Sequence, residues 1–305
     1  MRTRTLGNGG PEVSVVGLGC NNFGRRCDVE QTRAVVDAAL DSGITLLDTA
    51  DVYGEGLSED YLGQVLEGRR DRVVIATKFG HELPGGPAVL RGSREWIRWA
   101  CEQSLRRLRT DVIDLYQYHR PDGTTPLEET LGAMNELVDE GRVRWIGHSN
   151  FSPDQVEQAE RIAHEHGWAR CVSAQNRYSF VTREAEDELL PTCERLGVGM
   201  LPYFPLESGL LTGKYTRGET PTQGRLAARP ESLTDEAFDR VEALQAFADE
   251  RGVSLLEVAV GGLLAMPAVA SVIAGATKPE QVRANARAGG WEPSAGDVAA
   301  LKALR

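Results

Sequence analysis

A regular alternation of short β-rich runs with longer helical patterns is the sequence feature that most constrains the fold. The alternation extends through almost all of the 305 residues. Each run is mostly apolar, which is typical of parallel strands that are buried on both faces. The eight predicted strands cover residues 13–16, 44–47, 73–77, 113–118, 143–147, 171–175, 199–202 and 270–273.

Helix start and stop signals fill the gaps between these runs. The expected N-terminal caps are Asp28 with Gln31, Ser93, Thr125 with Pro126 and Glu128, Ser152 with Pro153, and Ser254 with Glu257, and the expected stops are Gly43, Gly141 and Gly167. Strands that alternate with helices in this way predict a closed (β/α)8 TIM barrel of the α/β class, with residues 1–305 as a single domain. A β-hairpin that turns at residues 7–10 is expected within residues 1–12, and an open doubly wound sheet is the competing architecture.

Charge and cysteine content exclude several classes of function. The net charge of −11 disfavours nucleic acid and anionic membranes as partners, so an anionic cofactor would need a local cluster of donors. The start of the chain lacks the apolar run of a signal peptide, and no uncharged apolar stretch reaches the roughly 20 residues of a membrane span. Five cysteines without CxxC spacing argue against a disulfide scaffold or structural zinc. A cytoplasmic enzyme with reduced thiols is therefore expected.

Four ionisable residues follow three consecutive predicted strands. Asp48 and Tyr53 follow the second strand, Lys78 the third and His119 the fourth. Because the carboxyl ends of neighbouring barrel strands meet at one face, these groups are expected to share a site. A Lys ammonium lowers the pKa of a nearby Tyr from its ordinary value of about 10, an Asp would hold the Lys, and a His would orient a carbonyl oxygen or relay a proton. Each residue alone is more typical of a turn, a rim or a surface position, but together they predict a general acid aimed at a carbonyl.

The segments around these residues resemble motifs of the aldo-keto reductase family. Residues 43–54, with the sequence GITLLDTADVYG, are similar to the family's first motif, residues 76–78 to the segment of its lysine, residues 114–119 to the segment that ends in its histidine, and residues 147–151 to its fifth-strand motif. The resemblance implies an NADPH-dependent oxidoreductase that reduces an aldehyde or ketone to an alcohol without a metal. It implies Tyr53 as the proton donor, Lys78 and Asp48 as the residues that tune it, and His119 as the residue that places the substrate.

The resemblance also implies where NADPH or NADP+ binds. The phosphates are expected near the seventh and eighth strands and at the start of a helix that Pro279 opens. The implied contacts are Ser149, Asn150 and Gln175 to the carboxamide, Tyr203 stacked on the nicotinamide, Leu206, Ser208, Gly209 and Lys214 in a pyrophosphate loop, and Gly275, Thr277, Lys278, Gln281 and Asn285 towards the adenosine. Lys278 favours a 2′-phosphate, whereas Gln281 stands where many family members have Arg. The near match to GxGxxG at residues 17–22 is interpreted as a strand-to-loop turn, because Asn22 replaces the third glycine.

The substrate is expected to be a small carbonyl compound whose identity the sequence leaves open. Candidate wall residues are Asn22, Phe23, Phe79, His81, Arg120 and Phe204, and the long connections 79–92 and 204–233 are expected lids or ligand clamps. A cofactor-binding regulatory subunit of the same fold is a second candidate function, since some family members are channel subunits. A metal-assisted barrel hydrolase or isomerase is a third, suggested by His148, His164 and His166, but the last two face different sides of a helix.

Overall fold

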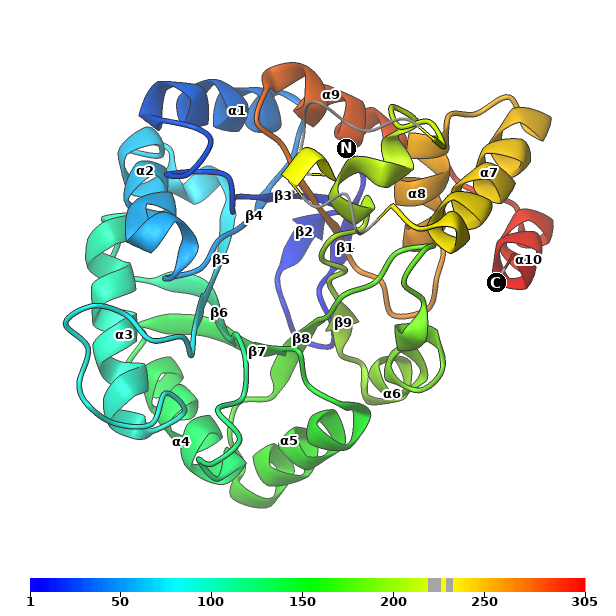
Figure 1. Ribbon diagram of the computed structural model, residues 1–305. Coiled ribbons are helices and arrows are strands. Elements are labelled where there is room, and N and C mark those ends of the chain that lie inside the picture. The colour runs from blue at the N-terminus through cyan, green and yellow to red at the C-terminus, as the bar shows by residue number, and fades with distance from the viewer. Residues whose placement is uncertain (219–225, 229–232, 305) are drawn as a thin grey trace.

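Eight parallel strands wrapped by helices form the body of the computed structural model, which describes residues 1–218, 226–228 and 233–304 (Figure 1). The strands are β3 (Val16–Gly19), β4 (Leu46–Asp48), β5 (Val74–Phe79), β6 (Ile113–Tyr118), β7 (Val143–Ser149), β8 (Cys171–Gln175), β9 (Gly199–Met200) and β10 (Val272–Gly275). They pair in chain order from β3 to β9, and β10 returns beside β3. Between β9 and β10, the N–H of Ala270 donates to the Met200 carbonyl (3.0 Å) and the N–H of Ile273 to the Pro202 carbonyl (3.2 Å). The predicted (β/α)8 barrel is therefore confirmed.

The helices lie around the outside of this sheet, with α7 and α10 outermost beside α8 (Figure 1). They are α1 (Val29–Asp41), α2 (Leu57–Val65), α3 (Arg94–Leu108), α4 (Leu127–Asp139), α5 (Pro153–His166), α6 (Leu189–Leu196), α7 (Asp235–Glu250), α8 (Leu255–Leu264), α9 (Pro279–Ala288) and α10 (Ala295–Ala303). The predicted caps at Asp28, Ser93, Ser152 and Ser254 are confirmed, and three of them form complete capping boxes. In the described parts of the chain, no helix has the length and apolarity that crossing a membrane requires.

The start of α4 differs from the prediction. Pro126 occupies the N-cap position and no side chain caps the helix, so the capping box assigned to Thr125 is wrong. The Thr125 hydroxyl instead donates to Asp122 Oδ2 (2.7 Å), while Oδ1 of the same carboxylate accepts the Thr125 N–H (2.8 Å). This turn around the Asp122 side chain keeps Thr125 in the loop before the helix.

The expected N-terminal hairpin is present, but it extends further than predicted. Strand β1 (Thr3–Thr5) pairs with β2 (Glu12–Ser14), so Val13 and Ser14 belong to the hairpin and the first barrel strand starts at Val16. The Ser14 hydroxyl donates to the Val16 carbonyl (2.7 Å) and accepts the Thr45 N–H (2.9 Å), which fixes the chain between hairpin and barrel. The last strand likewise starts at Val272, because Ala270 takes part in the closure with Met200.

The apolar core has two parts. The larger part lies between the sheet and the helices, and buried residues from Val15 to Leu301 contribute to it. The smaller part lies inside the barrel, where Leu6 and Val13 of the hairpin segment pack with Leu46, Leu115 and other strand residues. Figure 1 shows the hairpin lying across one end of the barrel. The other end, where the strands finish, is left for the site.

Candidate active site

A cleft of about 880 Å³ opens at the carboxyl ends of the strands. Its walls come from the carboxyl ends of the barrel strands or the segments that follow them, from β3 to β10, and from α8 and α9. Ligand sites typically measure about 300–1,000 Å³, so the cleft has room for a dinucleotide-sized molecule. Asp48, Tyr53 and His119 all line it.

Lys78 and Asp48 form a buried ion pair in the floor of this cleft. The parallel register of β4 and β5 sets Asp48 opposite Ala76, so Lys78 lies two residues further towards the carboxyl end of β5. The Lys78 side chain is fully buried, and its Nζ donates to Asp48 Oδ1 (2.8 Å) and to the Thr49 carbonyl (2.7 Å). Gln175 Nε2 donates to the same Oδ1 (2.8 Å). The lysine is thus held at one place with its charge balanced.

Tyr53 lies directly over this pair, half-buried at the start of a 3-10 turn (Tyr53–Gly56). Lys78 Nζ is 5.2 Å from the centre of the Tyr53 ring. Burial raises the pKa of the Tyr53 hydroxyl above its ordinary value, and the Lys78 ammonium, by its charge and a hydrogen bond, opposes that rise. The expectation that Lys78 would give Tyr53 a lowered pKa is therefore wrong in its net direction, because desolvation outweighs the ammonium. The phenol stays protonated at neutral pH.

His119 stands beside Tyr53 with its ring edge-on, and the two ring centres are 5.8 Å apart. His81 also contacts the His119 ring edge-on, with 4.5 Å between the ring centres. Burial, followed by the charge of Lys78, lowers the pKa of His119 from 6.5 to about 2. The imidazole is therefore neutral under ordinary conditions, and it can act as a hydrogen-bonding group but not as a cation.

The polar residues at the ends of β7 and β8 form one hydrogen-bond network. Ser149 Oγ donates to the Gln175 carbonyl (2.7 Å), and Asn150 Nδ2 donates to Ser149 Oγ (3.0 Å) and to the His119 carbonyl (2.9 Å). The Tyr203 hydroxyl donates to Asn150 Oδ1 (2.8 Å). Ser149, Asn150, Gln175 and Tyr203 all line the cleft.

Positive charge collects in the cleft although the whole chain is acidic. Among the described lining residues, Arg25, Arg26, Arg120 and Lys214 are basic, and Asp48 is acidic but already paired with Lys78. Of the residues expected to hold the cofactor, all except Lys278 line the cleft. Lys278 is exposed at the N-cap of α9.

Two lining arginines and one helix-start contact were not expected from the sequence. Arg25 and Arg26 lie in the loop after β3. Two adjacent arginines in a chain of net negative charge are the sequence feature that could have indicated them. Gln281 Oε1 accepts the Thr277 N–H (2.8 Å) and so holds the turn before α9. The turn after β3 leads into a loop and not into a helix, so the interpretation of residues 17–22 as a strand-to-loop turn is confirmed.

The expected substrate walls divide into two groups. Asn22, His81, Arg120 and Phe204 line the cleft, whereas Phe23 and Phe79 are fully buried and do not. The Phe79 ring lies behind the cleft, stacked on Tyr118 with ring centres 5.0 Å apart. Part of the connection 204–233 falls outside the described residues.

Within the described chain, no three His, Cys, Asp or Glu side chains are placed to share a metal ion.

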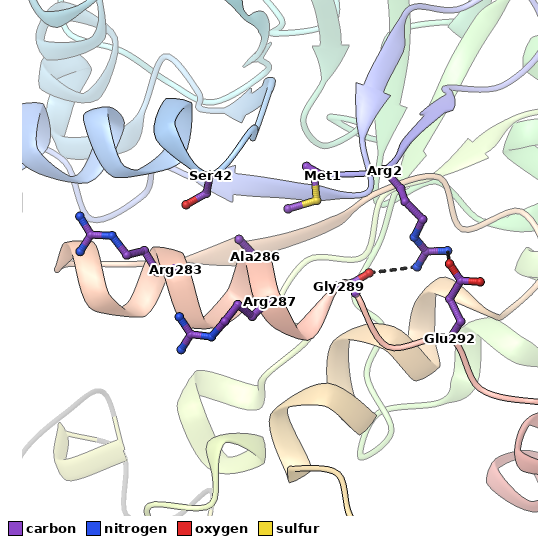
Figure 2. Close-up of a pocket in the computed structure, with 9 residues that line it drawn as sticks. Met1, Arg2, Ser42, Arg283, Ala286, Arg287, Gly289 and Glu292 are labelled. Carbon is purple, nitrogen blue, oxygen red and sulfur yellow. Dashed lines mark hydrogen bonds and ion pairs between the residues drawn. The ribbon is translucent and has the colours of Figure 1, made fainter.

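A second hollow of about 510 Å³ lies between α1, α9 and the first residues of the chain (Figure 2). It is remote from the strand ends. Arg2 in its wall is already engaged, by the Gly289 carbonyl (2.9 Å) and by Glu292 (2.5 Å). Figure 2 shows Arg283 and Arg287 extending away from Arg2, so the three guanidinium groups do not converge on one point. The reacting groups belong to the first cleft.

Comparison with known proteins shows the family to which the chain belongs. The sequence model of the aldo/keto reductase family matches residues 15–305. The chain is 36% identical over 301 residues to a protein of Oryza sativa subsp. japonica named "Probable voltage-gated potassium channel subunit beta", covering 94% of this chain and 91% of that one. It is 33% identical over 305 residues to L-glyceraldehyde 3-phosphate reductase of Escherichia coli O157:H7, covering 94% and 87%. The holo form of an aldo-keto reductase from Bacillus halodurans matches with a TM-score of 0.84 and 32% identity, covering 100% of this chain and 96% of that one. As its motifs predicted, the chain belongs to the aldo/keto reductase family of oxidoreductases.

Proposed function

We propose that this protein reduces an aldehyde or ketone to an alcohol with NADPH, and that Tyr53 donates the proton. One observation carries the proposal: the Tyr53 phenol lies in the cleft over the buried Lys78–Asp48 pair and beside the His119 imidazole. The family membership supports the reaction class. A small carbonyl compound is the expected partner.

The cleft fits a nicotinamide dinucleotide phosphate. Arg25, Arg26 and Lys214 supply charge for phosphates, and the turn at Thr277 precedes the amino end of α9, where an anion is favoured. Gly209, which also lines the cleft, has a φ of 99°, a backbone conformation that favours glycine and leaves the backbone there without a side chain. When bound, the cofactor supplies the hydride. Lys278 does not line the cleft itself but is exposed at the same helix start, and we assign to it the 2′-phosphate that would distinguish NADPH from NADH.

The residues of the chain would then complete the reduction. His119, as a neutral hydrogen-bonding group, orients the carbonyl oxygen towards the Tyr53 hydroxyl. The Tyr53 O–H bond breaks as the proton passes to that oxygen, which leaves a phenolate. The Lys78 ammonium stabilises this phenolate by its charge and hydrogen bond, and Asp48 keeps the ammonium in place. A proton from solvent restores the phenol for the next turnover.

The test is steady-state loss of NADPH absorbance with a panel of aldehydes and ketones. Tyr53→Phe removes the donated proton and keeps the ring, so turnover is expected to fall by roughly 10²–10⁴ while NADPH binding persists. Tyr61→Phe, which removes a tyrosine hydroxyl outside the cleft, is the matched control. Turnover by Tyr53→Phe at the native rate would exclude Tyr53 as the donor.

A cofactor-binding regulatory subunit is the second candidate, favoured by the relatives named as potassium channel β-subunits in Oryza sativa and Arabidopsis thaliana. The complete set of Asp48, Tyr53, Lys78 and His119 supports the enzyme. Tight NADPH binding without turnover of any carbonyl in the panel would favour the subunit instead.

We also propose that residues 1–305 form one domain and that the protein works in the cytoplasm. The continuous core from Val15 to Leu301 supports the first proposal. All five cysteines are free and buried, which supports a reducing compartment. Limited proteolysis and cell fractionation test the two proposals.

A further inference from the structure

Arg120 is a cation at the reacting end of the cleft, and the described residues supply no counter-ion for it. It follows His119 directly and lines the cleft with an exposed side chain. Across residues 1–218, 226–228 and 233–304, it makes no side-chain hydrogen bond and no ion pair. In a chain with a net charge of −11, an unbalanced guanidinium beside the reacting groups calls for an explanation.

The acidic groups around Arg120 are already committed elsewhere. Asp122, two residues on, accepts the N–H groups of Gly92 (2.8 Å), Thr124 (2.9 Å) and Thr125 (2.8 Å) and the Thr125 hydroxyl (2.7 Å). Glu207, buried between the lining residues Leu206 and Ser208, accepts from Arg177 (2.7 Å) and Ser179 (2.7 Å). Asp48 in the floor is paired with Lys78. No protein carboxylate among these is left to neutralise Arg120.

The guanidinium lies close enough to act on the reacting groups. Its charge lowers the pKa of His119 and of His81, and it also lowers that of Tyr203 against the larger effect of burial. His81 and His119 are in ring contact, and His119 is in ring contact with Tyr53. A molecule whose carbonyl oxygen meets Tyr53 therefore has Arg120 within reach of its other end.

The position of Arg120 separates it from the phosphate-binding cations of the cleft. It follows β6, whereas the start of α9 follows β10, and in the strand order β10-β3-β4-β5-β6 these two strands lie on opposite sides of the barrel. Arg25 and Arg26 follow β3, which pairs with β10. Arg120 thus faces the substrate side of the reacting groups, away from the dinucleotide phosphates.

We propose that the carbonyl substrates of this protein carry an anionic group, a carboxylate or a phosphate, which Arg120 binds while the carbonyl oxygen faces Tyr53 and His119. The inference rests on the proposed reductase function. A guanidinium presents paired N–H donors that match the oxygens of either anion, and it keeps its charge at any working pH. His81, half-buried beside Arg120, adds a neutral donor or acceptor to the same end of the cleft.

Matched substrate pairs test this proposal with the full chain and NADPH. The carboxylate pair is 4-carboxybenzaldehyde and its methyl ester, methyl 4-formylbenzoate. The phosphate pair is glyceraldehyde 3-phosphate and glyceraldehyde. In at least one pair, kcat/KM for the anion is expected to exceed that for the neutral partner by about tenfold or more, as one charge-assisted hydrogen-bonded contact provides. The pair with the larger ratio identifies the anion.

Variants of Arg120 assign the preference to this residue. Arg120→Gln is expected to lower kcat/KM for the anion by about 10- to 100-fold, mainly through KM, with little change for the neutral partner or for the KM of NADPH. Arg120→Lys keeps the charge and is expected to recover part of the loss. The control is Arg33→Gln. Arg33 is an exposed arginine on α1, so this variant removes one positive charge outside the cleft and shows how much of the change comes from net charge alone.

Three outcomes would overturn the proposal. Ratios near one in both pairs would show that the cleft does not select anions, although the reductase function would stand. An equal loss by Arg120→Gln for anion and neutral partner, or a raised KM for NADPH, would show that Arg120 supports the structure or the cofactor. Failure of all four substrates and of the wider carbonyl panel would remove the reductase function itself, and this inference with it.

Discussion

At the scale of single residues, the buried Lys78–Asp48 pair serves both stability and chemistry. Lys78→Met removes the cation and leaves the Asp48 carboxylate buried, with Gln175 Nε2 as its remaining side-chain donor. Breaking a buried pair in this way costs about 3–5 kcal/mol, so urea unfolding should show a loss of stability of that order.

The double variant Asp48→Asn with Lys78→Met is the control, because it removes both charges from the buried position. It is expected to recover much of the stability but none of the turnover, since Tyr53 then lacks its ammonium. Equal stability of the single and double variants would mean that the carboxylate left by Lys78→Met is not buried as the structure has it.

His148 gives a pH dependence of stability that is separate from catalysis. Its side chain is 1% exposed, its ring stacks on Phe151 at 4.3 Å, and burial lowers its pKa from 6.5 to about 3. Because the unfolded chain binds a proton at His148 below pH 6.5 and the folded chain does not, the contribution is fully present above pH 6.5 and is lost as the pH falls towards 3. The slope from this one group is at most about 1.4 kcal/mol per pH unit.

Denaturant unfolding between pH 7 and pH 4 checks this prediction by comparing the native chain with His148→Leu. The variant is expected to lose less stability over that range, whereas His164→Leu, at an exposed position on α5, is expected to follow the native curve. Parallel curves for the native chain and His148→Leu would contradict the prediction.

The sequence predicted which reacting residues lie together, but not the net direction in which their surroundings shift the pKa of Tyr53. Asp48, Tyr53, Lys78 and His119 were recognisable because each follows a β-rich run. The pKa of Tyr53 was expected on the wrong side of its ordinary value, because burial is a property of the folded environment and no local pattern reports it. Phe23 and Phe79 were expected in the substrate wall, but strand alternation turns Phe79 into the layer behind the cleft.

At the scale of elements, Asp122 joins the two loops on the substrate side of the cleft. It lies between β6 and α4, and it accepts the N–H of Gly92 at the end of the loop that follows β5. Backbone and side-chain donors lower the pKa of this carboxyl to about 2. The loop 79–92, which carries His81, is therefore anchored at its end by the hydrogen bond from Gly92 to Asp122.

Asp122→Ala is expected to loosen the loop 79–92 and to raise KM for the carbonyl substrate more than it lowers kcat, because it touches none of the reacting groups. Hydrogen–deuterium exchange should become faster in residues 79–92 and 120–125 and stay unchanged in β3 and β4. Asp111→Ala, an exposed residue before β6, is the control. Unchanged exchange at Gly92 would contradict the role of Asp122.

Strands with a clear β-rich run were predicted well, but the residues at which several strands begin and end were not. Strands 113–118 and 171–175 match β6 and β8 residue for residue. The run 13–16 was predicted as one strand, although the chain changes partner within it, from β1 at Val13 and Ser14 to β10 at Val16. Pairing partners are set by tertiary contacts, and so a continuous β-branched run conceals the break.

At the scale of the whole molecule, the two ends of the barrel have separate tasks. The strand ends hold the cleft, while the hairpin segment covers the opposite opening and places Leu6 and Val13 in the inner core. Only glycine fits at position 7 of that opening, because its φ is 65° and a Cβ there would lie 2.3 Å from the Val172 carbonyl oxygen. Barrels of this type commonly place stability at the amino ends of the strands and chemistry at the carboxyl ends.

Leu6→Ala tests that separation. Leu6 is fully buried in the inner core with Leu46 of β4 and Leu201, which follows β9, so its truncation is expected to lower the free energy of unfolding by about 2–5 kcal/mol. The exposed Leu90→Ala should change it by less than about 0.5 kcal/mol. At temperatures where Leu6→Ala remains folded, kcat and the KM of NADPH should equal the native values, because the whole inner core lies between Leu6 and the cleft. A large change in either constant at full folding would show that packing at the hairpin end sets the geometry of Tyr53 and Lys78, and that the two ends of the barrel are mechanically coupled.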